Sequence, residues 1–262
     1  MHPTPETRMN QLILERQVAP RAHVPLVLAR GVSIAAGNGT PLVHDLNFHV
    51  MSGAFQVLLG PGHSSAIHVL AALVRPIRGQ LLVEGLDLSE LSECEAIAYR
   101  RAAVNIVSTS PNLLPRLTLQ ENLELTLLLT PQSRSERRDR ARSALELVGL
   151  GRVATRRASE LSVGTAQRVS IARALLNGAN LILLDEPCAR AAPAERVKVL
   201  ELLAQLNTVF QKTIVLGTTD PSLRAWASNV HELASPACSA VWQRSRLGFP
   251  DPRPQAVEAL SA

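Results

Sequence analysis

The chain has few aromatic residues, few cysteines and no long hydrophobic run, and each of these scarcities narrows its possible functions. Phe, Trp and Tyr make up 3% of the 262 residues, which disfavours a nucleic-acid surface that stacks bases on aromatic rings. The three cysteines, Cys94, Cys188 and Cys238, are too widely spaced for a zinc site or a disulfide framework, which favours a reducing cytosol. No run of 18 or more apolar residues predicts a membrane span. We therefore expect any role at a membrane to depend on a partner.

Lysine is almost absent from the chain. Of the 27 basic residues only Lys198 and Lys212 are lysines, so the other 25 are arginines. The net charge of +5 and the pI of about 9.8 are compatible with an anionic partner. The arginines are spread along the chain, however, which indicates a compositional preference and not a binding patch. The first 22 residues are mixed and polar, without the apolar core of a signal peptide.

Two terminal segments differ in composition from the rest of the chain. We expect residues 1–23 to form a disordered extension and the proline-rich residues 236–262 a disordered tail. Over 24–235, apolar runs of strand length alternate with segments of helical period, as in a mostly parallel sheet covered by helices. Strands are expected at 25–30, 42–50, 54–59, 80–84, 103–108, 180–184, 213–218 and 229–233. Residues of about 110–160 have Leu, Glu and Arg at helical spacing and predict a helical subdomain inserted into the sheet domain.

Three motifs follow one another along the chain. The strand expected at 54–59 is followed by Gly-Pro-Gly-His-Ser-Ser, and a later helical segment opens with Leu161-Ser-Val-Gly-Thr. The strand at 180–184 then ends in two adjacent carboxylates, Asp185 and Glu186. This order resembles the ATP-binding subunit of ABC transporters, which has a P-loop, a signature loop and a Walker B strand.

The resemblance extends over about 25–235 and implies a fold and a branch of the family. The implied fold is α/β, an ABC-type ATP-binding domain: a P-loop NTPase-like sheet core with an antiparallel β portion and an inserted helical subdomain. The segments 88–93 (Leu-Ser-Glu-Leu-Ser-Glu) and 121–125 (Glu-Asn-Leu-Glu-Leu) are most similar to the branch of lipoprotein-releasing and macrolide-export subunits.

The glycine-rich loop departs from the P-loop pattern in length and in its cation. The motif G-x-x-x-x-G-K-[ST] places four residues between its glycines, whereas only Pro61 separates Gly60 from Gly62. The loop is therefore about three residues short, and His63 stands in the lysine position. We interpret it as a tight strand-to-helix turn; the alternative is a working P-loop with histidine in place of lysine. The residues that such a loop would offer to phosphates are Gly60, Gly62, His63, Ser64 and Ser65, with Ser64 also a candidate Mg²⁺ ligand.

The carboxylate pair keeps the family's residue types. By the resemblance, Asp185 would hold Mg²⁺ through water and Glu186 would polarise the attacking water. Without a lysine and Mg²⁺ two adjacent carboxylates repel each other, so the pair is either a relic or a working half-site. Four other positions have lost the family's side chain: Ala36 for the adenine-stacking aromatic, Thr109 for the Q-loop glutamine, Ala192 for the D-loop aspartate and Thr219 for the switch histidine. These departures together predict the loss of independent ATP hydrolysis.

The signature loop is less altered. Ser162 and Gly164 match the family's serine and second glycine, whereas Val163 and Thr165 replace a glycine and a glutamine. In the family two subunits pair head to tail, and each signature loop closes over the γ-phosphate held by the other subunit. Two interpretations stay open: the loop completes a partner's site, or Ser162 is an ordinary helix cap.

The sequence therefore predicts an ATP-binding-subunit-like component of a bacterial ABC transporter that is degenerate as an ATPase. ATP and Mg²⁺ are implied only by the resemblance. The expected partners are membrane-spanning transporter subunits and an ATP-competent ABC subunit in a head-to-tail dimer, which would place the chain in the cytoplasm, peripheral on the inner face of the plasma membrane. One alternative is an active ABC ATPase with an atypical P-loop that energises transport. Another is a nucleic-acid-associated ABC protein, although nucleic acid is not the expected partner.

Overall fold

The computed structural model describes residues 24–35, 41–128 and 130–233. The extension expected at 1–23, the tail expected at 236–262 and the position of Ala36 lie outside the described residues. In the part of the chain that the structure describes, no helix is both long and apolar enough to cross a membrane.

A parallel sheet forms the centre of the domain. Its strand order is β6-β7-β8-β3-β9, and each neighbouring pair is parallel. The strands are β3 (Phe55–Leu59), β6 (Val104–Val107), β7 (Leu181–Asp185), β8 (Thr213–Thr218) and β9 (Asn229–Glu232). Every residue of β3 and β8 is buried, as expected for strands that are covered on both faces by helices or by another sheet.

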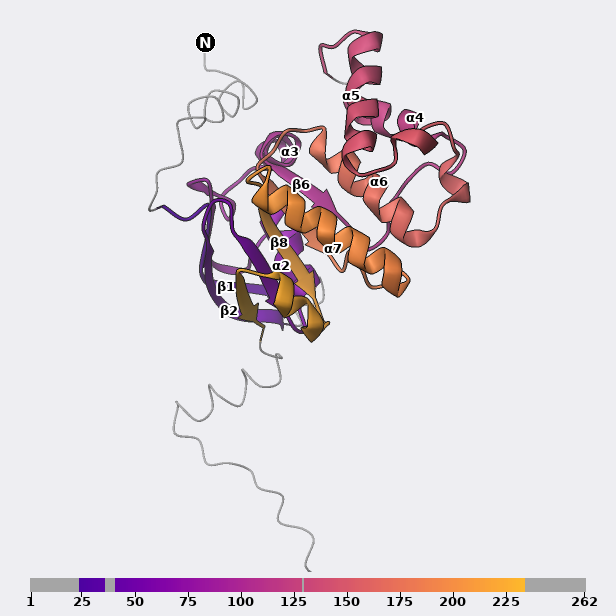
Figure 1. The fold of residues 1–262 in the computed structure, drawn as a ribbon. Coiled ribbons are helices and arrows are strands. Elements are labelled where there is room, and N and C mark those ends of the chain that lie inside the picture. Colours follow the sequence, from indigo (N-terminus) through magenta and orange to yellow (C-terminus); the bar gives the residue numbers. More distant parts are fainter. Residues whose placement is uncertain (1–23, 36–40, 129, 234–262) are drawn as a thin grey trace, which may run out of the picture.

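A second, antiparallel sheet lies beside the first (Figure 1) and has the order β2-β1-β4-β5. Its strands are β1 (Val27–Ala35), β2 (Pro41–Val50), β4 (Arg78–Val83) and β5 (Leu86–Asp87). All eight expected strands are present, but the first was predicted at 25–30 and is longer. The polar pair Arg30 and Gly31 interrupts its apolar run, and a register shift after Arg30 with a positive φ of 60° at Gly31 lets the strand continue. The two-residue β5 was not expected, because it is too short to show a pattern.

Helices cover both faces of the parallel sheet. They are α2 (His63–Leu70), α3 (Glu93–Ala102), α4 (Leu119–Glu124), α5 (Arg134–Leu147), α6 (Val163–Leu175) and α7 (Pro193–Thr208), with the short 3₁₀ turns η1 (Leu125–Leu127), η2 (Gly151–Val153), η3 (Ala158–Glu160) and η4 (Pro221–Trp226). Capping boxes begin α3, α4 and α5, which explains where these helices start. The described residues between 110 and 160 contain helices and one isolated bridge, but no strand. In Figure 1 α4 and α5 lie at the end of the molecule away from β1 and β2.

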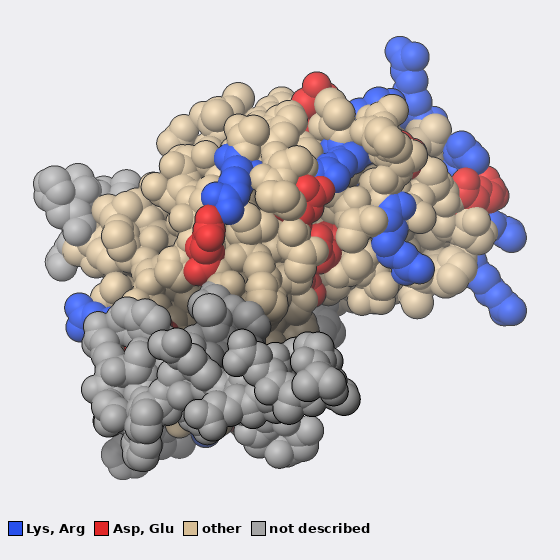
Figure 2. Space-filling view, turned by 90° about the horizontal axis from the view of Figure 1, so that it is seen from below, with Lys and Arg blue, Asp and Glu red and all other residues tan. Residues whose placement is uncertain are grey.

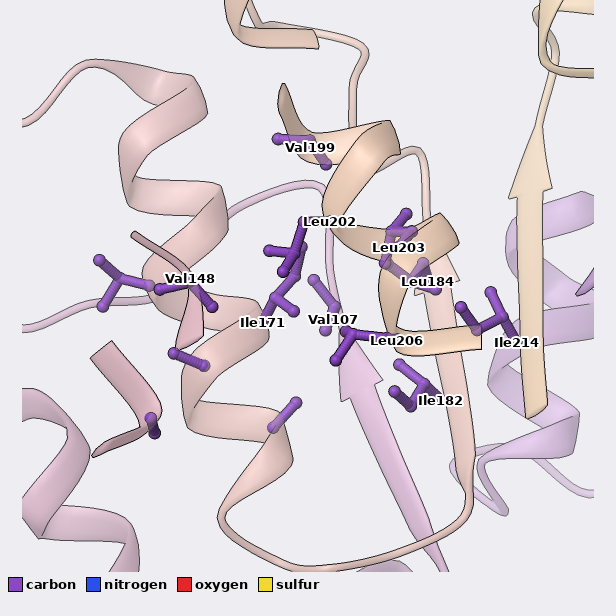
Figure 3. Packing of buried hydrophobic residues seen from close by; sticks show 14 of the residues in the cluster. Val107, Val148, Ile171, Ile182, Leu184, Val199, Leu202, Leu203, Leu206 and Ile214 are labelled. Carbon is purple, nitrogen blue, oxygen red and sulfur yellow. The ribbon is translucent and has the colours of Figure 1, made fainter. Parts of the chain in front are cut away.

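Two hydrophobic clusters stabilise the arrangement. In the first, α6, α7 and the helices of 110–160 pack on one face of the parallel sheet. Figure 3 shows Ile171 of α6 and Leu202 and Leu206 of α7 converging on the strands. The second cluster joins the other face to α2, α3 and the antiparallel sheet. The carboxyl ends of β3, β7 and β8 are thus held side by side, and at this edge the predicted site residues meet.

Candidate functional site

The turn between β3 and α2 is tight. Gly60 and Gly62 have positive φ values of 120° and 86°, which glycine adopts without steric cost. A Cβ atom on Gly60 would lie 2.7 Å from the carbonyl oxygen of Leu233, and one on Gly62 would lie 2.7 Å from Cγ2 of Val43. The two glycines therefore lie against the end of β9 and the antiparallel sheet, and neither could carry a side chain unless its neighbours shifted.

Two amide groups of this turn already have partners within the chain. The Gly60 N–H donates to the carbonyl of Thr218 at 2.9 Å, and the His63 N–H donates to the carbonyl of Gly60 at 3.4 Å. Pro61 has no N–H at all. Because a P-loop binds phosphates through free backbone N–H groups, residues 60, 61 and 63 of this turn offer no free donor.

His63 faces the two carboxylates and is buried. Its Nδ1 lies 2.9 Å from the Gly60 carbonyl oxygen, which can only accept, so Nδ1 carries the hydrogen. Its Nε2 lies 3.5 Å from Asp185 Oδ1 and 3.5 Å from Glu186 Oε1. In the imidazolium form both nitrogens would donate, one to the turn and one toward the carboxylates. The histidine thus places its own ring beside the acidic pair, where the family has a lysine.

Asp185 is bound by two side chains of its own chain. The Ser64 hydroxyl donates to Asp185 Oδ1 at 2.7 Å, and the Thr109 hydroxyl donates to the Asp185 backbone carbonyl at 3.0 Å. The structure thus brings two predicted site residues, Ser64 and Asp185, into direct contact. Ser65 is half-buried in the first turn of α2 and takes no part in these contacts.

Glu186 is held by the end of β8. Its Oε2 accepts a hydrogen bond from the Thr218 hydroxyl at 2.9 Å, and its Oε1 accepts from the Thr219 N–H at 2.7 Å and from the Thr219 hydroxyl at 3.0 Å. Both oxygens therefore have donors from the same chain. Thr219, at the switch position, contacts the glutamate directly, and the fully buried Thr218 is a site residue that the sequence reasoning missed. The sequence showed Thr218 as the last residue of an expected strand, but not which strand lies beside it.

The signature loop lies at the start of α6. Ser162 is the N-cap residue, and its hydroxyl accepts a hydrogen bond from the Thr165 N–H at 3.3 Å. The same hydroxyl donates to the carboxylate of Glu195 in the first turn of α7, and the Gly164 N–H donates to Glu195 Oε2 at 3.1 Å. Donation by Ser162 is the main reason why the pKa of Glu195 lies below its ordinary value. Glu195 is a second residue that the sequence reasoning missed.

A parallel sheet whose Walker B carboxylates meet a glycine turn, together with a capped signature loop at the start of α6, defines the class of ABC-type ATP-binding domains. Residues 43–189 match the family model described as ABC transporter. The chain belongs to this family.

Relatives of known sequence include exporters and separate ATP-binding proteins. An ABC transporter ATP-binding protein of Thermotoga maritima is 39% identical over 67% of this chain and 76% of its own length. The macrolide export ATP-binding/permease protein MacB of Marinobacter nauticus is 35% identical over 76% of this chain, but over 32% of its own length. The chain thus spans about a third of that exporter's length. The similarity to MacB proteins agrees with the macrolide-export branch predicted from the sequence.

Solved structures of similar proteins support the same fold. The ATP-binding cassette MJ0796, solved as a dimer in a post-hydrolysis state bound to ADP and Pi, superposes with a TM-score of 0.70 at 30% identity. The match covers 79% of this chain and 94% of that one.

The family binds ATP with Mg²⁺, and the residues of this chain fit that pair poorly. Mg²⁺ in such sites keeps an octahedral oxygen shell that waters and substrate phosphates complete, and it neutralises the phosphate charge. Here the Gly60 and His63 amides are already hydrogen-bonded, the His63 ring faces both carboxylates, and Ser64 binds Asp185 directly. Several of the groups that would hold Mg-ATP are thus engaged within the chain.

Proposed function

We propose that this chain is a degenerate ATP-binding subunit of a bacterial ABC transporter that does not hydrolyse ATP by itself. One observation carries the proposal: both oxygens of Glu186 accept hydrogen bonds from Thr218 and Thr219, while His63 and Ser64 lie against Asp185. A glutamate that polarises water needs an oxygen directed at the substrate, and here both are bound by Thr218 at the end of β8 and by Thr219 directly after it.

The charge balance of the site supports the same conclusion. Two carboxylates at a strand end need a cation or several donors, and this chain supplies the hydroxyls of Ser64, Thr218 and Thr219 and one backbone N–H. The acidic pair therefore has a structural role in joining β7 to α2 and β8. Retention of Asp185 and Glu186 does not require a retained ATPase activity.

The proposed partners are membrane-spanning subunits and an ATP-competent ABC subunit. The similar cassette MJ0796 forms a dimer with ADP and Pi, and the similar exporters are named as combined ATP-binding and permease proteins. In such a pair Ser162 and Gly164 would face a nucleotide held by the other subunit. The partners would keep the chain on the inner face of the plasma membrane.

The surface charge gives no support to a nucleic-acid role. Figure 2 shows basic and acidic side chains interspersed on one face, with the basic ones more frequent toward one end. Several arginines are paired with nearby acids, as in Arg142 with Glu146 and Arg156 with Glu160. A salt-dependent shift of a nucleic-acid probe would be the sign of that alternative.

Titration of the purified chain with Mg-ATP tests the proposal. We expect a dissociation constant in the millimolar range or weaker, because the lysine is missing, three residues of the turn offer no free N–H, and each lost contact costs about 1–3 kcal/mol. The matched control is Glu186→Gln, which should leave any residual phosphate release unchanged. Low-micromolar binding together with hydrolysis that depends on Glu186 would establish instead an active ATPase with an atypical P-loop.

A further inference from the structure

The helical subdomain contains a cavity of about 910 Å³ that is lined by α5, by α4 and by residues at and after η2. Its charged lining residues all come from α5: Arg134, Arg138, Asp139 and Arg142. Three positive charges thus meet one negative charge, which gives the lining a net charge of +2. In Figure 2 basic side chains are more frequent toward the end of the molecule at which Figure 1 shows α4 and α5. The cavity shares no residue with the carboxylate site.

The three arginines of this cavity form a regular row. They are spaced four residues apart and therefore share one face of α5. A helix rises 1.5 Å per residue, so successive arginines lie about 6 Å apart along the helix axis. Among the described residues, the guanidinium groups of Arg134 and Arg138 have no hydrogen-bond or ion-pair partner. Arg142 pairs with Glu146 at 3.2 Å, but both side chains are exposed, and such a pair contributes little stability. The row can therefore bind an anionic ligand at little cost.

The same cavity also offers hydrogen-bond acceptors. The Asp139 carboxylate lines it and has no partner among the residues that the structure describes. The side-chain N–H of Gln120 donates to Glu124 at 2.8 Å, which leaves the amide oxygen of Gln120 as an acceptor. A ligand that satisfies both kinds of group needs negative charges and N–H donors together. An acidic peptide has both, since its backbone supplies one N–H per residue, whereas phosphate groups of lipids or nucleic acids supply none.

The spacing of the arginines fits an extended peptide. In a strand, alternate side chains point to one face, and a rise of about 3.3 Å per residue places them about 6.6 Å apart. Carboxylates at alternate positions can therefore each meet one guanidinium group, with which they form strong paired hydrogen bonds. The chain's own terminal segments do not supply such a peptide. Residues 1–23 contain three arginines and two acids, and residues 234–262 likewise contain three arginines and two acids, so each segment has a net side-chain charge of +1.

We propose that the row of Arg134, Arg138 and Arg142 binds an extended acidic peptide segment of another protein, with carboxylates at alternate residues. The carboxylates accept hydrogen bonds from the guanidinium groups, and backbone N–H groups of the peptide donate to Asp139 and Gln120. This docking site goes beyond the proposed function, because it depends neither on nucleotide nor on the pairing of two ATP-binding subunits.

A fluorescent, N-acetylated peptide in which glutamate alternates with threonine is the probe for the full-length chain. Its binding is measured by fluorescence anisotropy. Arg138→Gln removes the central guanidinium group and should weaken binding by at least about fivefold. The matched control is Arg101→Gln, an exposed arginine of α3. It changes the net charge equally but should change binding by less than about twofold, because distant surface charges are screened.

A second peptide tests the spacing. It has the same number of glutamates, placed at every third residue, so that successive glutamates of an extended chain point to opposite faces. It should bind at least about fivefold more weakly than the alternating peptide. The backbone amide resonances of Gly151 and Thr155, which line the cavity, should shift on addition of the alternating peptide. The urea midpoint of Arg138→Gln should equal that of the unchanged protein, because Arg138 is exposed.

Equal binding of the two peptides, equal effects of Arg138→Gln and Arg101→Gln, or no binding at millimolar peptide would overturn the inference. Binding of phosphatidylglycerol vesicles or single-stranded DNA that Arg138→Gln weakens, without binding of the peptide, would assign the row to a membrane or to nucleic acid instead. Salt-dependent self-association that Arg138→Gln abolishes would identify a second copy of the chain as the occupant. None of these results bears on the Mg-ATP titration, which tests the proposed function separately.

Discussion

The substitution Thr218→Val tests whether Glu186 has a structural role. Thr218 is fully buried, and its hydroxyl both donates to Glu186 Oε2 and accepts from the Asp220 N–H at 3.0 Å. Valine preserves the β-branched shape, so the change removes hydrogen bonds and little else. A hydrogen bond to a charged group is worth about 1.5–3 kcal/mol and a neutral one about 0.5–1.5 kcal/mol. We therefore expect the free energy of unfolding to fall by about 2–4 kcal/mol.

Thr219→Val is the matched control. Thr219 is exposed, and its backbone N–H keeps its bond to Glu186 Oε1 when the hydroxyl is lost. Water can replace that hydroxyl, so the expected loss is about 0.5 kcal/mol or less. The structure thus predicts a large difference between two neighbouring threonines that both contact Glu186.

Urea unfolding measures both losses. The midpoint should move while the slope with denaturant stays the same, since neither change alters the surface exposed on unfolding. The melting temperature should fall by roughly 10 °C for Thr218→Val, at about 2–4 °C per kcal/mol for a domain of this size. In a Glu186→Gln background, the Thr218→Val loss should shrink by about 1 kcal/mol or more. Equal small losses for the two threonines would refute the structural role of Glu186.

Three further outcomes are expected. His63→Lys alone should not create ATPase activity, because a lysine on the short turn still lacks the full ring of amides of a P-loop. Its phosphate release should match that of Glu186→Gln, and a clear rate that Glu186→Gln abolishes would contradict this. In a complex reconstituted with an ATP-competent subunit, Ser162→Ala should lower the hydrolysis rate roughly tenfold, whereas Glu186→Gln should leave it nearly unchanged. A larger loss for Glu186→Gln than for Ser162→Ala would assign catalysis to this chain. The pKa of Asp220 lies below its ordinary value because Ser222 donates hydrogen bonds to it. The stability that ionised Asp220 contributes is therefore present above the ordinary aspartate pKa and is lost as the pH falls through the lowered pKa. Asp220→Asn should remove that part of the acid dependence of unfolding, and an unchanged pH profile would refute it.

Much of the fold was predictable because the apolar runs of the parallel sheet are continuous. β7 and β8 are buried along nearly their whole length, so their sequences contain few polar interruptions. The exact extent of β1 was not predictable, because whether a strand ends or bulges at Gly31 depends on its pairing with β4.

The site was predictable only in part. The order of the motifs is visible in the sequence, and these motifs contain His63, Asp185 and Glu186. The partners Thr218 and Glu195 depend on which strand lies beside β7 and which helix begins beside α6. These contacts join residues more than 30 positions apart, such as Thr218 with Glu186, and no local pattern records them. The group that a hydrogen-bond donor at a strand end contacts depends on which strand lies beside it.

The tight turn at Gly60 and Gly62 limits the routes by which this chain could acquire a phosphate loop of the usual length. Lengthening the turn would need the insertion of several residues at once, and a side chain at either glycine would meet Leu233 or Val43. A partial insertion would move His63 away from the carboxylates that it faces. No single-residue change therefore restores the loop of the family's pattern. Under the proposed function, selection would act instead on contacts with other subunits.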